Sequence, residues 1–362
     1  MSEETEETKE KKAKIPKKKV TGDPYLDAII NNLQQTFGKE DLICRGIPEN
    51  SHLKISSTGS VGLDISLGSG GIPIGRIVEV FGPESSGKTS LTLQFLATYQ
   101  KLKKELGHEN RYDLLLDLEH TITEDLLVGI GVDPDQVLWS KPGLAEEAFQ
   151  TALNLTKSKQ IGMMVLDSID AAQSAAQLKK GIGENEMGGI SKLMSRFLRE
   201  YSKDCESTET TAIFINQIRQ NPAQMFGSPV VTPGGNALKF YSSVRLETMN
   251  AQETKTPNAF GMRVKVVKNK IRPPRKDPTA FDFRYAEGVE PFGDLFNCAK
   301  DLGIIHSGGQ SIKVDVPGII EGDTLVSTGG KESAVILLAD DPELYLRLKN
   351  KCLELGTKKK VT

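Results

Sequence analysis

The sequence has few cysteines and no long apolar run, and each shortage excludes a class of protein. Its 4 cysteines, at positions 44, 205, 298 and 352, show no paired spacing, so neither a disulfide framework nor a zinc site is indicated. Runs of about 18 apolar residues, which a membrane helix needs, are missing. The charged N-terminus does not fit a secretory signal peptide. We therefore expect a cytoplasmic protein with reduced thiols and no membrane partner.

An excess of positive charge is also lacking. The 362 residues hold 46 Lys and Arg against 48 Asp and Glu, a formal net charge of −2, which argues against a uniformly basic coat and leaves only local DNA sites open. With 38% hydrophobic residues the chain can bury a core, and its length favours two or three domains. Residues 1–22 are mainly Glu-rich and then Lys-rich and predict a disordered tail. A nuclear-address or DNA-tethering role for Lys17–Lys19 is the alternative.

A glycine-rich stretch lies between an expected strand and an expected helix. Residues 82–89 read Gly-Pro-Glu-Ser-Ser-Gly-Lys-Thr and fit the phosphate-loop pattern G-x-x-x-x-G-K-[ST]. Residues 77–81 predict a buried strand, and residues 90–106 carry apolar side chains at helical spacing. Such a turn directs backbone N–H groups at a polyphosphate. Lys88 then reaches the β- and γ-phosphates, and Thr89 coordinates Mg²⁺. The alternative is a glycine-rich turn that binds nothing.

Three further apolar runs alternate with expected helices. The runs span residues 112–117, 161–167 and 211–216, and the helices between them span residues 144–156 and 190–201. Strands that are apolar on both faces predict a parallel sheet covered by helices on two sides. Later segments alternate more openly and predict an antiparallel extension: residues 243–247, 262–268 and 281–285. The expected fold class is therefore α/β, with a mainly parallel sheet and an antiparallel extension.

The segments outside this sheet are shorter. Residues 23–37 have apolar positions at helical spacing between Asp23-Pro24 and Gly38, and they predict one amphipathic helix. Its apolar face needs a partner, either in its own domain or in a neighbouring subunit. Residues 57–75 are dense in Gly and Ser and are interpreted as turns. The expected division is a tail at 1–22, an N-terminal helix region at 23–56, a core at 57–287, a small domain at 288–355 and a Lys-rich tail at 356–362.

Polar side chains stand at the ends of three expected strands. Because ligands of parallel sheets bind beyond the carboxyl ends of the strands, these side chains should face the nucleotide. Glu119 is placed to orient or deprotonate a water that attacks the γ-phosphate. Asp167 has the form of the second nucleotide motif, whose Asp holds Mg²⁺ through water, although an Asp that caps the next turn is the alternative. Gln217 can bond the γ-phosphate and anchor the segment after it.

Two long segments, residues 178–189 and 218–235, come after the second and third of these strands. The second segment has prolines near each end and is too irregular for a helix or strand, and long structureless loops in compact domains are usually functional. Lys179, Lys180, Arg219 and the pair Met225-Phe226 favour a site that tracks the backbone of a single-stranded nucleic acid. Two surface lids over the nucleotide are the alternative.

Five sequence blocks in register resemble the RecA family of recombinases, over about residues 24–355. They are Gly82–Thr89, Asp117–His120, Phe214–Arg219, Gly234–Tyr241 and Val264–Lys270. The resemblance implies a RecA-type P-loop ATPase core, a short N-terminal oligomerisation helix that docks on the adjacent protomer, and a small α+β C-terminal domain. It implies a helical filament on single-stranded DNA with ATP between protomers, DNA-stimulated ATP hydrolysis, and strand exchange with double-stranded DNA in repair and the SOS response. Repressor or mediator proteins would be further partners.

The resemblance also assigns residue roles by position. The residues implied in catalysis are Lys88, Glu119, Lys268 and Lys270, of which the last two match lysines that reach into the neighbour's nucleotide site. The residues implied in ATP binding are Gly82, Pro83, Glu84, Ser85, Ser86, Gly87, Lys88, Thr89, Ser90, Leu126, Asp167 and Gln217, with Thr89 and Asp167 on Mg²⁺. The residues implied in DNA binding are Lys179, Lys180, Met187, Gly188, Lys192, Arg199, Arg219, Met225, Phe226, Gly234, Gly235 and Asn236.

The sequence departs from the family pattern in places. Leu126 replaces an aromatic residue that stacks on adenine, and Thr123 replaces an acidic residue nearby, so ring stacking and one hydrogen-bond partner are lost. Lys192 replaces an arginine, and Lys358–Lys360 stand in place of an acidic tail, which predicts weaker self-inhibition of DNA binding. Two rival functions remain: a helicase-like motor ATPase on the same fold, and a filament scaffold that binds nucleotide and DNA with little turnover.

Overall fold

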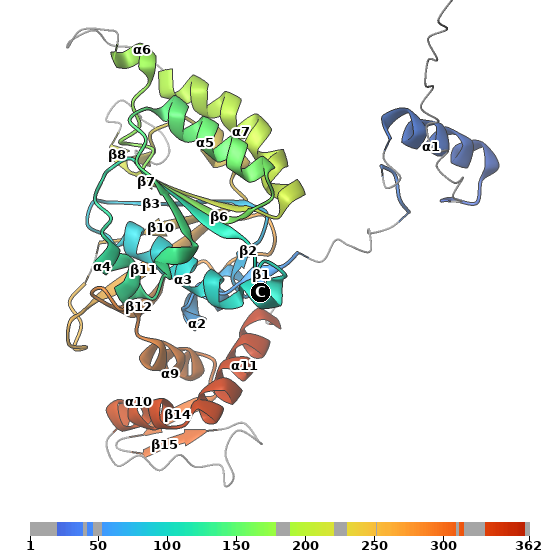
Figure 1. Ribbon diagram of the computed structural model, residues 1–362. Helices are drawn as coiled ribbons and strands as arrows, with labels where there is room; N and C mark the ends of the chain where they lie inside the picture. The colour runs from blue at the N-terminus through green and yellow to red at the C-terminus, as the bar shows by residue number, and fades with distance from the viewer. Residues whose placement is uncertain are drawn as a thin grey trace, which may run out of the picture. The chain divides into compact units, whose positions relative to one another are not determined.

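The chain forms two separate units. The structure, a computed structural model, describes residues 20–38, 42–45, 53–178, 189–220, 230–250, 252–308, 311–314 and 330–358 (Figure 1). Contacts divide the chain into residues 1–53 and residues 54–362. In the first unit, helix α1 (Pro24–Phe37) begins at Asp23, whose carboxylate accepts from the backbone N–H of Tyr25 and Leu26, and ends at Gly38 in the left-handed conformation. The predicted helix at 23–37 is confirmed.

The second unit is built on one large sheet. Within the described residues it has nine strands in the order β13-β12-β11-β10-β3-β7-β6-β4-β5. Their bounds are β3 (Ile77–Gly82), β4 (Tyr112–Asp117), β5 (Val137–Ser140), β6 (Ile161–Asp167), β7 (Thr211–Gln217), β10 (Val244–Thr248), β11 (Ala259–Asn269), β12 (Thr279–Arg284) and β13 (Gly288–Val289). From β10 to β5 all neighbours are parallel, and β11, β12 and β13 are antiparallel. The predicted fold class is confirmed, with the correction that β10 runs parallel to β3.

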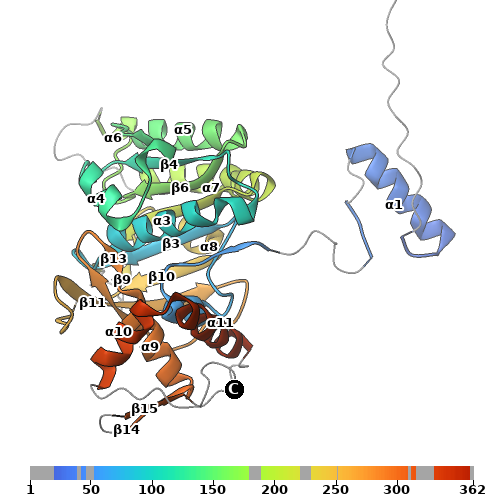
Figure 2. The same ribbon diagram turned by 60° about the horizontal axis from the view of Figure 1, so that its bottom comes forward.

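Helices cover both faces of this sheet (Figures 1 and 2). Along β6, Met163 and Val165 pack in the cluster that contains α3 (Lys88–Leu106), whereas Met164 and Leu166 pack with α5 (Ala145–Lys157) and α7 (Gly189–Thr208). Successive side chains of a strand point to opposite faces. Because both faces are buried, the central strands are continuously apolar in sequence. The α5–α7 side is reinforced by the stacked rings of Phe149 and Phe197, whose centroids are 4.5 Å apart.

One short helix and one pair of short strands correct the interpretation of loops. Helix α2 (Val61–Leu67) occupies the middle of the segment interpreted as turns. Ser60 Oγ caps it by accepting from the backbone N–H of Leu63, and Gly68 ends it, but all seven residues are buried, so no polar face reveals the helical period. In the segment 218–235, β8 (Arg219–Gln220) pairs with β9 (Val230–Val231). Two residue pairs are too few to produce a visible alternation. The minor elements are β1 (Ile55–Ser56), β2 (Ile72–Pro73), α4 (Glu124–Ile130), η1 (Pro134–Gln136), α6 (Ala175–Leu178) and α8 (Ala237–Tyr241).

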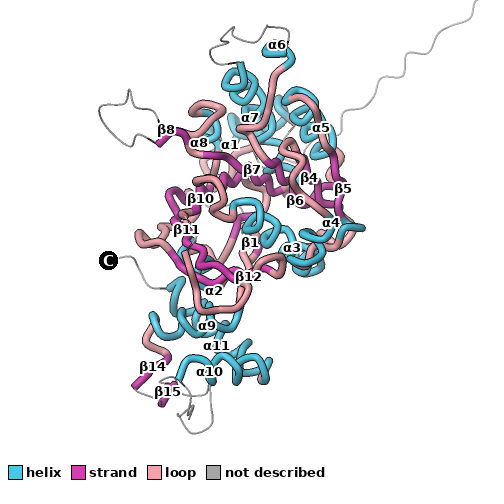
Figure 3. Tube along the Cα trace, turned by 90° about the vertical axis from the view of Figure 1, so that its left-hand side faces the viewer, coloured by secondary structure: helices cyan, strands magenta, loops and turns pink. Residues whose placement is uncertain are grey.

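The C-terminal helices lie together beside α2 (Figures 1 and 3). They are α9 (Pro291–Asp301), α10 (Gly330–Asp340) and α11 (Pro342–Lys358), with the hairpin β14 (Ile305–Gly308) and β15 (Ser311–Val314). Val61 and Ile65 of α2 share a hydrophobic cluster with these helices. This segment thus contains both helices and strands, as expected for a small α+β C-terminal domain. The boundary at residue 288 stays a prediction. Among the described helices, none is long and apolar enough to cross a membrane.

Candidate nucleotide and DNA sites

The phosphate loop joins β3 to α3 at the carboxyl edge of the sheet. Gly87 precedes α3 with φ of 81°, and a Cβ there would lie 2.6 Å from Cε of Met262, so any side chain at this position would be strained. No side chain caps this helix end and no acidic residue lies in its first turn. The first N–H groups of α3 are therefore left for an anion, which the helix dipole also favours.

Lys88 closes the loop on itself. Its Nζ donates to the carbonyl of Pro83 at 2.6 Å, and Ser86 Oγ donates to the same carbonyl at 2.7 Å. The side chain is buried, and burial lowers the pKa of Lys88, although the carboxylates of Asp167 and Glu119 oppose that shift. An ammonium held only by a neutral carbonyl can exchange that partner for a phosphate oxygen at little cost. Glu84 and Ser85 are exposed at the tip of the loop, and Ser90 is half-buried in α3.

Three oxygen-bearing side chains meet beside the first turn of α3. Thr89 Oγ1 donates to Asp167 Oδ2 at 2.7 Å. Asp167 is buried, and burial, with the nearby carboxylates of Glu119 and Asp117, raises its pKa to about 7 against the hydrogen bond from Thr89. Glu119 Oε1 accepts a hydrogen bond from Ser168 Oγ. The structure thus brings Thr89, Asp167 and Glu119 to one place, where a phosphate-bound cation and a water would be contacted together.

The base of the second loop is tied to the same strand ends. Gln217 ends β7 in register with Gly82 of β3. Beside it, Asn216 Nδ2 donates to the carbonyl of Pro233 at 3.0 Å and to Glu79 Oε1 at 3.3 Å. Arg219 pairs with Asp170, which comes after β6, at 2.6 Å. Both ends of the loop are therefore held by residues next to the nucleotide site.

Lys268 and Lys270 lie away from the phosphate loop, near the amino ends of the parallel strands. Both ammonium groups donate to the carbonyl of Phe240 at the end of α8, Lys270 at 2.8 Å. Lys268 is in register with Arg245, which in turn lies opposite Glu79 of β3. Gly82 is three residues further along β3, about 10 Å toward the other edge of the sheet. The structure therefore does not bring these lysines to the phosphate loop of their own chain.

The described DNA-binding candidates gather around the start of α7. Lys192 and Arg199 are exposed on one face of the helix, and with Ser191, Ser195 and Arg196 they line a surface groove. A Cβ on Gly235 would lie 2.9 Å from Ser191 Oγ, so the end of the second loop touches the start of this helix. Gly234 and Asn236 flank that contact, and Figure 3 shows α7, α8 and β8 on one side of the molecule. The remaining candidates lie outside the described residues: Lys179, Lys180, Met187, Gly188, Met225 and Phe226.

Comparison with known proteins identifies the family. The sequence model of the RecA N-terminal domain matches residues 24–290. A protein RecA of Nocardioides sp. is 37% identical over 332 residues, which cover 91% of this chain and 90% of the relative. A protein RecA of Streptomyces coelicolor is 38% identical over 329 residues, covering 90% and 84%. One of Streptococcus equi subsp. zooepidemicus is 36% identical over 333 residues, covering 90% and 84%. The chain belongs to the RecA family.

Membership in the RecA family confirms the predicted function. The protein is a DNA recombinase that forms filaments on single-stranded DNA, catalyses homologous pairing and strand exchange in recombination and repair, and hydrolyses ATP in a DNA-dependent manner. It is a P-loop nucleotide-binding protein, as the strand-loop-helix setting of residues 82–89 predicts.

Two of the positions at which the chain departs from the RecA pattern, Thr123 and Leu126, have structural roles. Thr123 caps α4, because its Oγ1 accepts from the backbone N–H of Leu126 at 3.3 Å. Leu126 is half-buried and packs against the main hydrophobic cluster of the core. The threonine therefore replaces an acidic side chain with another good capping residue, and the leucine is an apolar side chain without a ring.

Two residues next to the candidate residues have no role assigned from the sequence. Arg196 was missed, although Lys192, Arg196 and Arg199 are spaced i, i+4 and i+7, which places all three on one helical face. Asp117 lies in a block that resembles RecA, but nothing in the sequence singles out its side chain. In the structure it is fully buried beside Asp167.

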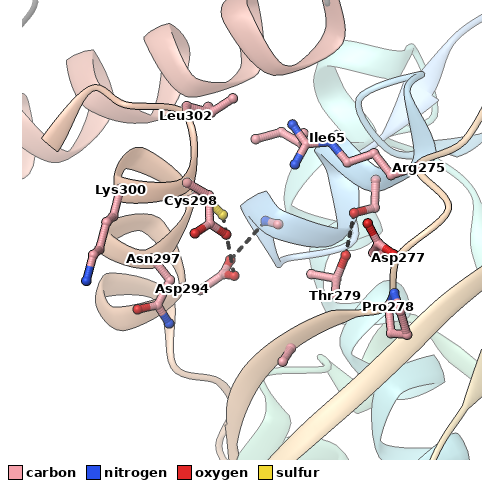
Figure 4. Close-up of a pocket in the computed structure, with 14 residues that line it drawn as sticks. Ile65, Arg275, Asp277, Pro278, Thr279, Asp294, Asn297, Cys298, Lys300 and Leu302 are labelled. Atoms are coloured by element: carbon pink, nitrogen blue, oxygen red, sulfur yellow. Dashed lines mark hydrogen bonds between the residues drawn. The ribbon is translucent and has the colours of Figure 1, made fainter. Parts of the chain in front are cut away.

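A second pocket lies between α2, the segment before β12 and α9 (Figure 4). Its walls carry charges of both signs, including Arg275, Asp277 and Lys300. The buried Asp294 accepts from the backbone N–H of Gly62 at 3.3 Å, and burial raises the pKa of the Cys298 thiol far above its usual range. A protonated thiol is a poor nucleophile. Among the described residues, no three His, Cys, Asp or Glu side chains are placed to hold a metal by themselves.

Proposed function

We propose that this recombinase binds ATP with Mg²⁺ on the phosphate loop and that Thr89, Asp167 and Glu119 prepare the γ-phosphate for attack by water. The observation that carries the proposal is the meeting of these three side chains beside the uncapped start of α3. Thr89 and Asp167 would hold Mg²⁺, which would supply positive charge against the negative charge that develops on the transferred phosphoryl group. Lys88 leaves the carbonyl of Pro83 for the phosphates, and Glu119 orients the water.

We infer that Lys268 and Lys270 act on the nucleotide of a neighbouring protomer. They lie at the amino ends of the parallel strands, away from their own phosphate loop, and this position supports a contribution in trans. Positive charge supplied in trans to a transferring phosphoryl group is worth about 10³–10⁵ in rate. Helix α1 supplies the protomer contact, because Tyr25, Leu26 and Phe37 are exposed apolar side chains on it. The division of the chain into tail, helix region, core, small domain and tail belongs to this proposal.

Gln217 is the proposed coupling residue between ATP and DNA. It ends the strand beside the phosphate loop, and its neighbour Asn216 holds the carbonyl of Pro233 at the other end of the loop. A γ-phosphate that draws Gln217 toward Gly82 would move a loop base that is held on both sides. DNA then contacts the loops at 178–189 and 218–235 and the exposed cations at the start of α7.

The experiment is steady-state ATP hydrolysis with and without single-stranded DNA, at two salt concentrations. The unchanged protein should show strong stimulation that fades with salt, because phosphate contacts release counterions. Gln217→Ala should keep ATP affinity close to that of the unchanged protein and lose the stimulation. Gln160→Ala, an exposed glutamine at the opposite edge of the sheet, is the matched control and should behave normally. Full stimulation of Gln217→Ala would remove the coupling role.

Repressor or mediator proteins as partners, and a cytoplasmic location, are parts of the proposal that depend on the likeness to RecA. Pull-down of tagged protein on single-stranded DNA with and without ATP would test whether partner binding needs the filament. A partner retained equally without DNA and ATP would contradict a filament-dependent interaction.

A further inference from the structure

Asp117 is a buried carboxylate without a partner. It ends β4, none of its surface is exposed, and neither of its side-chain oxygens has a hydrogen-bond partner within the part of the chain that the structure describes. Buried polar groups are nearly always satisfied, and an unpaired buried carboxylate is one of the most costly groups that a fold can contain. A residue of this kind therefore calls for a group that the protein does not itself supply.

The side chain of Asp117 lies on the same face of the sheet as α3, next to Asp167. Side chains two residues apart on a strand share a face, and Leu115 packs in the cluster that contains α3. Asp117 therefore lies on the α3 side of the sheet. Its register partner on β6 is Asp167, whose carboxylate reaches Thr89 in the first turn of α3. The two carboxylates thus lie side by side on adjacent strands, near the first turn of α3.

The same strand contains a contrasting residue. Asp113 is equally buried and lies on the same face of β4, but it pairs with Lys103 Nζ at 2.9 Å and accepts from Gln100 Nε2 at 3.0 Å. The fold thus places a cation beside one buried aspartate of β4. At the other end of the strand, the ammonium of Lys88 is turned to the carbonyl of Pro83 and leaves Asp117 without a cation.

We propose that Asp117 is a positioning residue for the Mg²⁺ that accompanies ATP, accepting hydrogen bonds from water molecules on the metal alongside Asp167. The inference rests on the nucleotide site proposed above. Mg²⁺ gives up its water reluctantly and is usually held by one or two carboxylates together with phosphates, so a protein that binds it through its water shell needs acceptors behind the first layer of ligands. Asp117 is such an acceptor, and Thr89 with Asp167 completes the set on the protein side.

The proposal makes an unusual prediction about stability. Replacing a carboxylate that is hydrogen-bonded in the core removes those hydrogen bonds from the folded protein. Replacing a buried carboxylate that has no partner removes none. Asp117→Asn keeps the shape and removes the charge, so the melting temperature of the nucleotide-free protein should stay the same or rise. Asp113→Asn removes the partner of a buried lysine, and its melting temperature should fall.

The test measures binding of ADP to the full-length chain as a function of Mg²⁺ concentration, together with binding of Mn²⁺ in the presence of ADP by electron paramagnetic resonance. Asp117→Asn should need about tenfold more Mg²⁺ for half-maximal ADP binding, and should weaken Mn²⁺ by a similar factor, since changes behind the metal ligands cost about 10–100-fold in metal affinity. Asp113→Asn should leave both values unchanged.

Three outcomes would decide against the proposal. An unchanged Mg²⁺ requirement in Asp117→Asn, with a raised requirement in Asp167→Asn, overturns the role of Asp117 and leaves the proposed nucleotide site intact. An Asp117→Asn protein that fails to fold, or that loses stability as Asp113→Asn does, shows a structural carboxylate and overturns it as well. If Asp167→Asn also keeps the normal Mg²⁺ requirement, the proposed magnesium site fails and the inference with it.

Discussion

The amino ends of the parallel strands form the amino edge of the sheet, and their carboxyl ends form the carboxyl edge. Both edges contain buried aspartate and lysine side chains, which are paired with each other at the amino edge and not at the carboxyl edge. At the amino edge, Lys103 pairs with Asp113 at 2.9 Å and also donates to the carbonyl of Arg111 and to Gln136. At the carboxyl edge, Asp117 has no partner among the described residues, and Lys88 has a carbonyl in place of a carboxylate. Only three residues of β4 lie between Asp113 and Asp117. The charged groups at the amino edge are paired within the fold, whereas those at the carboxyl edge are left to interact with a ligand.

The difference shows where stability and function divide in this molecule. Buried groups that are fully paired make the fold more rigid. Removal of one partner leaves the other buried and unpaired. Groups held in unfavourable surroundings, such as Asp167 with its raised pKa, are typical of functional sites. Strand β4 therefore contributes a paired core residue at its start and a residue next to the nucleotide site at its end.

The largest effect is expected from the carboxyl edge. Glu119→Gln should lower DNA-stimulated ATP hydrolysis by about 10²–10⁴-fold, the range for loss of a general base, because the amide still accepts from Ser168 but cannot orient or deprotonate water as a carboxylate does. Stability and ATP binding should change little. Single-turnover hydrolysis with saturating ATP measures the effect, and Glu124→Gln, an exposed residue of α4, is the control. Near-normal turnover in Glu119→Gln would assign the water to another group.

A change at the amino edge should affect stability in place of turnover. Lys103→Met leaves Asp113 buried without its cation, which should cost about 3–5 kcal/mol of the free energy of unfolding. Hydrolysis per folded molecule should stay normal at low temperature. Urea unfolding measures the change, with Lys104→Met as the control on an exposed neighbour. A loss of turnover without a loss of stability would break the distinction between the two edges.

The cations on α7 extend the comparison beyond the sheet. Lys157 of α5 is paired with Glu200 of α7. Lys192, Arg196 and Arg199 form no ion pair within the described chain, although the charge of Arg196 helps to lower the pKa of Glu200. Arg196→Gln should weaken DNA binding at every sequence and lower the slope of log affinity against log salt by about one. Titration of labelled single-stranded DNA at several salt concentrations gives the slope. Lys159→Gln, an exposed cation at the amino edge, should leave it unchanged. An equal effect of both variants would indicate a general effect of charge.

Most of the fold was predictable because it is dictated by burial patterns. The strands β6 and β7 are buried on both faces, and so they appear as continuous apolar runs. Helix α2 was hidden for the same reason, since a helix that is buried all round has no polar face. Strand β5 is not predicted from the sequence because it is the outermost strand of the sheet, where Leu138 and Trp139 stay partly exposed.

The site was predictable to the extent that topology determines it. Parallel strands end at one edge, so the proximity of Thr89 and Asp167 is expected from the motifs and the chain order. The contrast between Asp113 and Asp117 is not, because it depends on which way two lysine side chains turn. Spacing alone places Arg196 on the same face as Arg199, and that signal was present in the sequence.

The smallest expected effect concerns pH at the amino edge. His108 is buried between Tyr99, Glu209, Arg111 and Lys54, and burial lowers its pKa below the usual 6.5 against the pull of Glu209. In the unfolded chain the imidazole binds a proton below pH 6.5 that the folded protein does not, so stability should fall as pH falls through that value. His108→Gln should remove this component and flatten the acid side of the stability profile. Thermal melts of both proteins between about pH 5 and 8 measure it, and an equally steep acid loss in His108→Gln would place the sensitive group elsewhere.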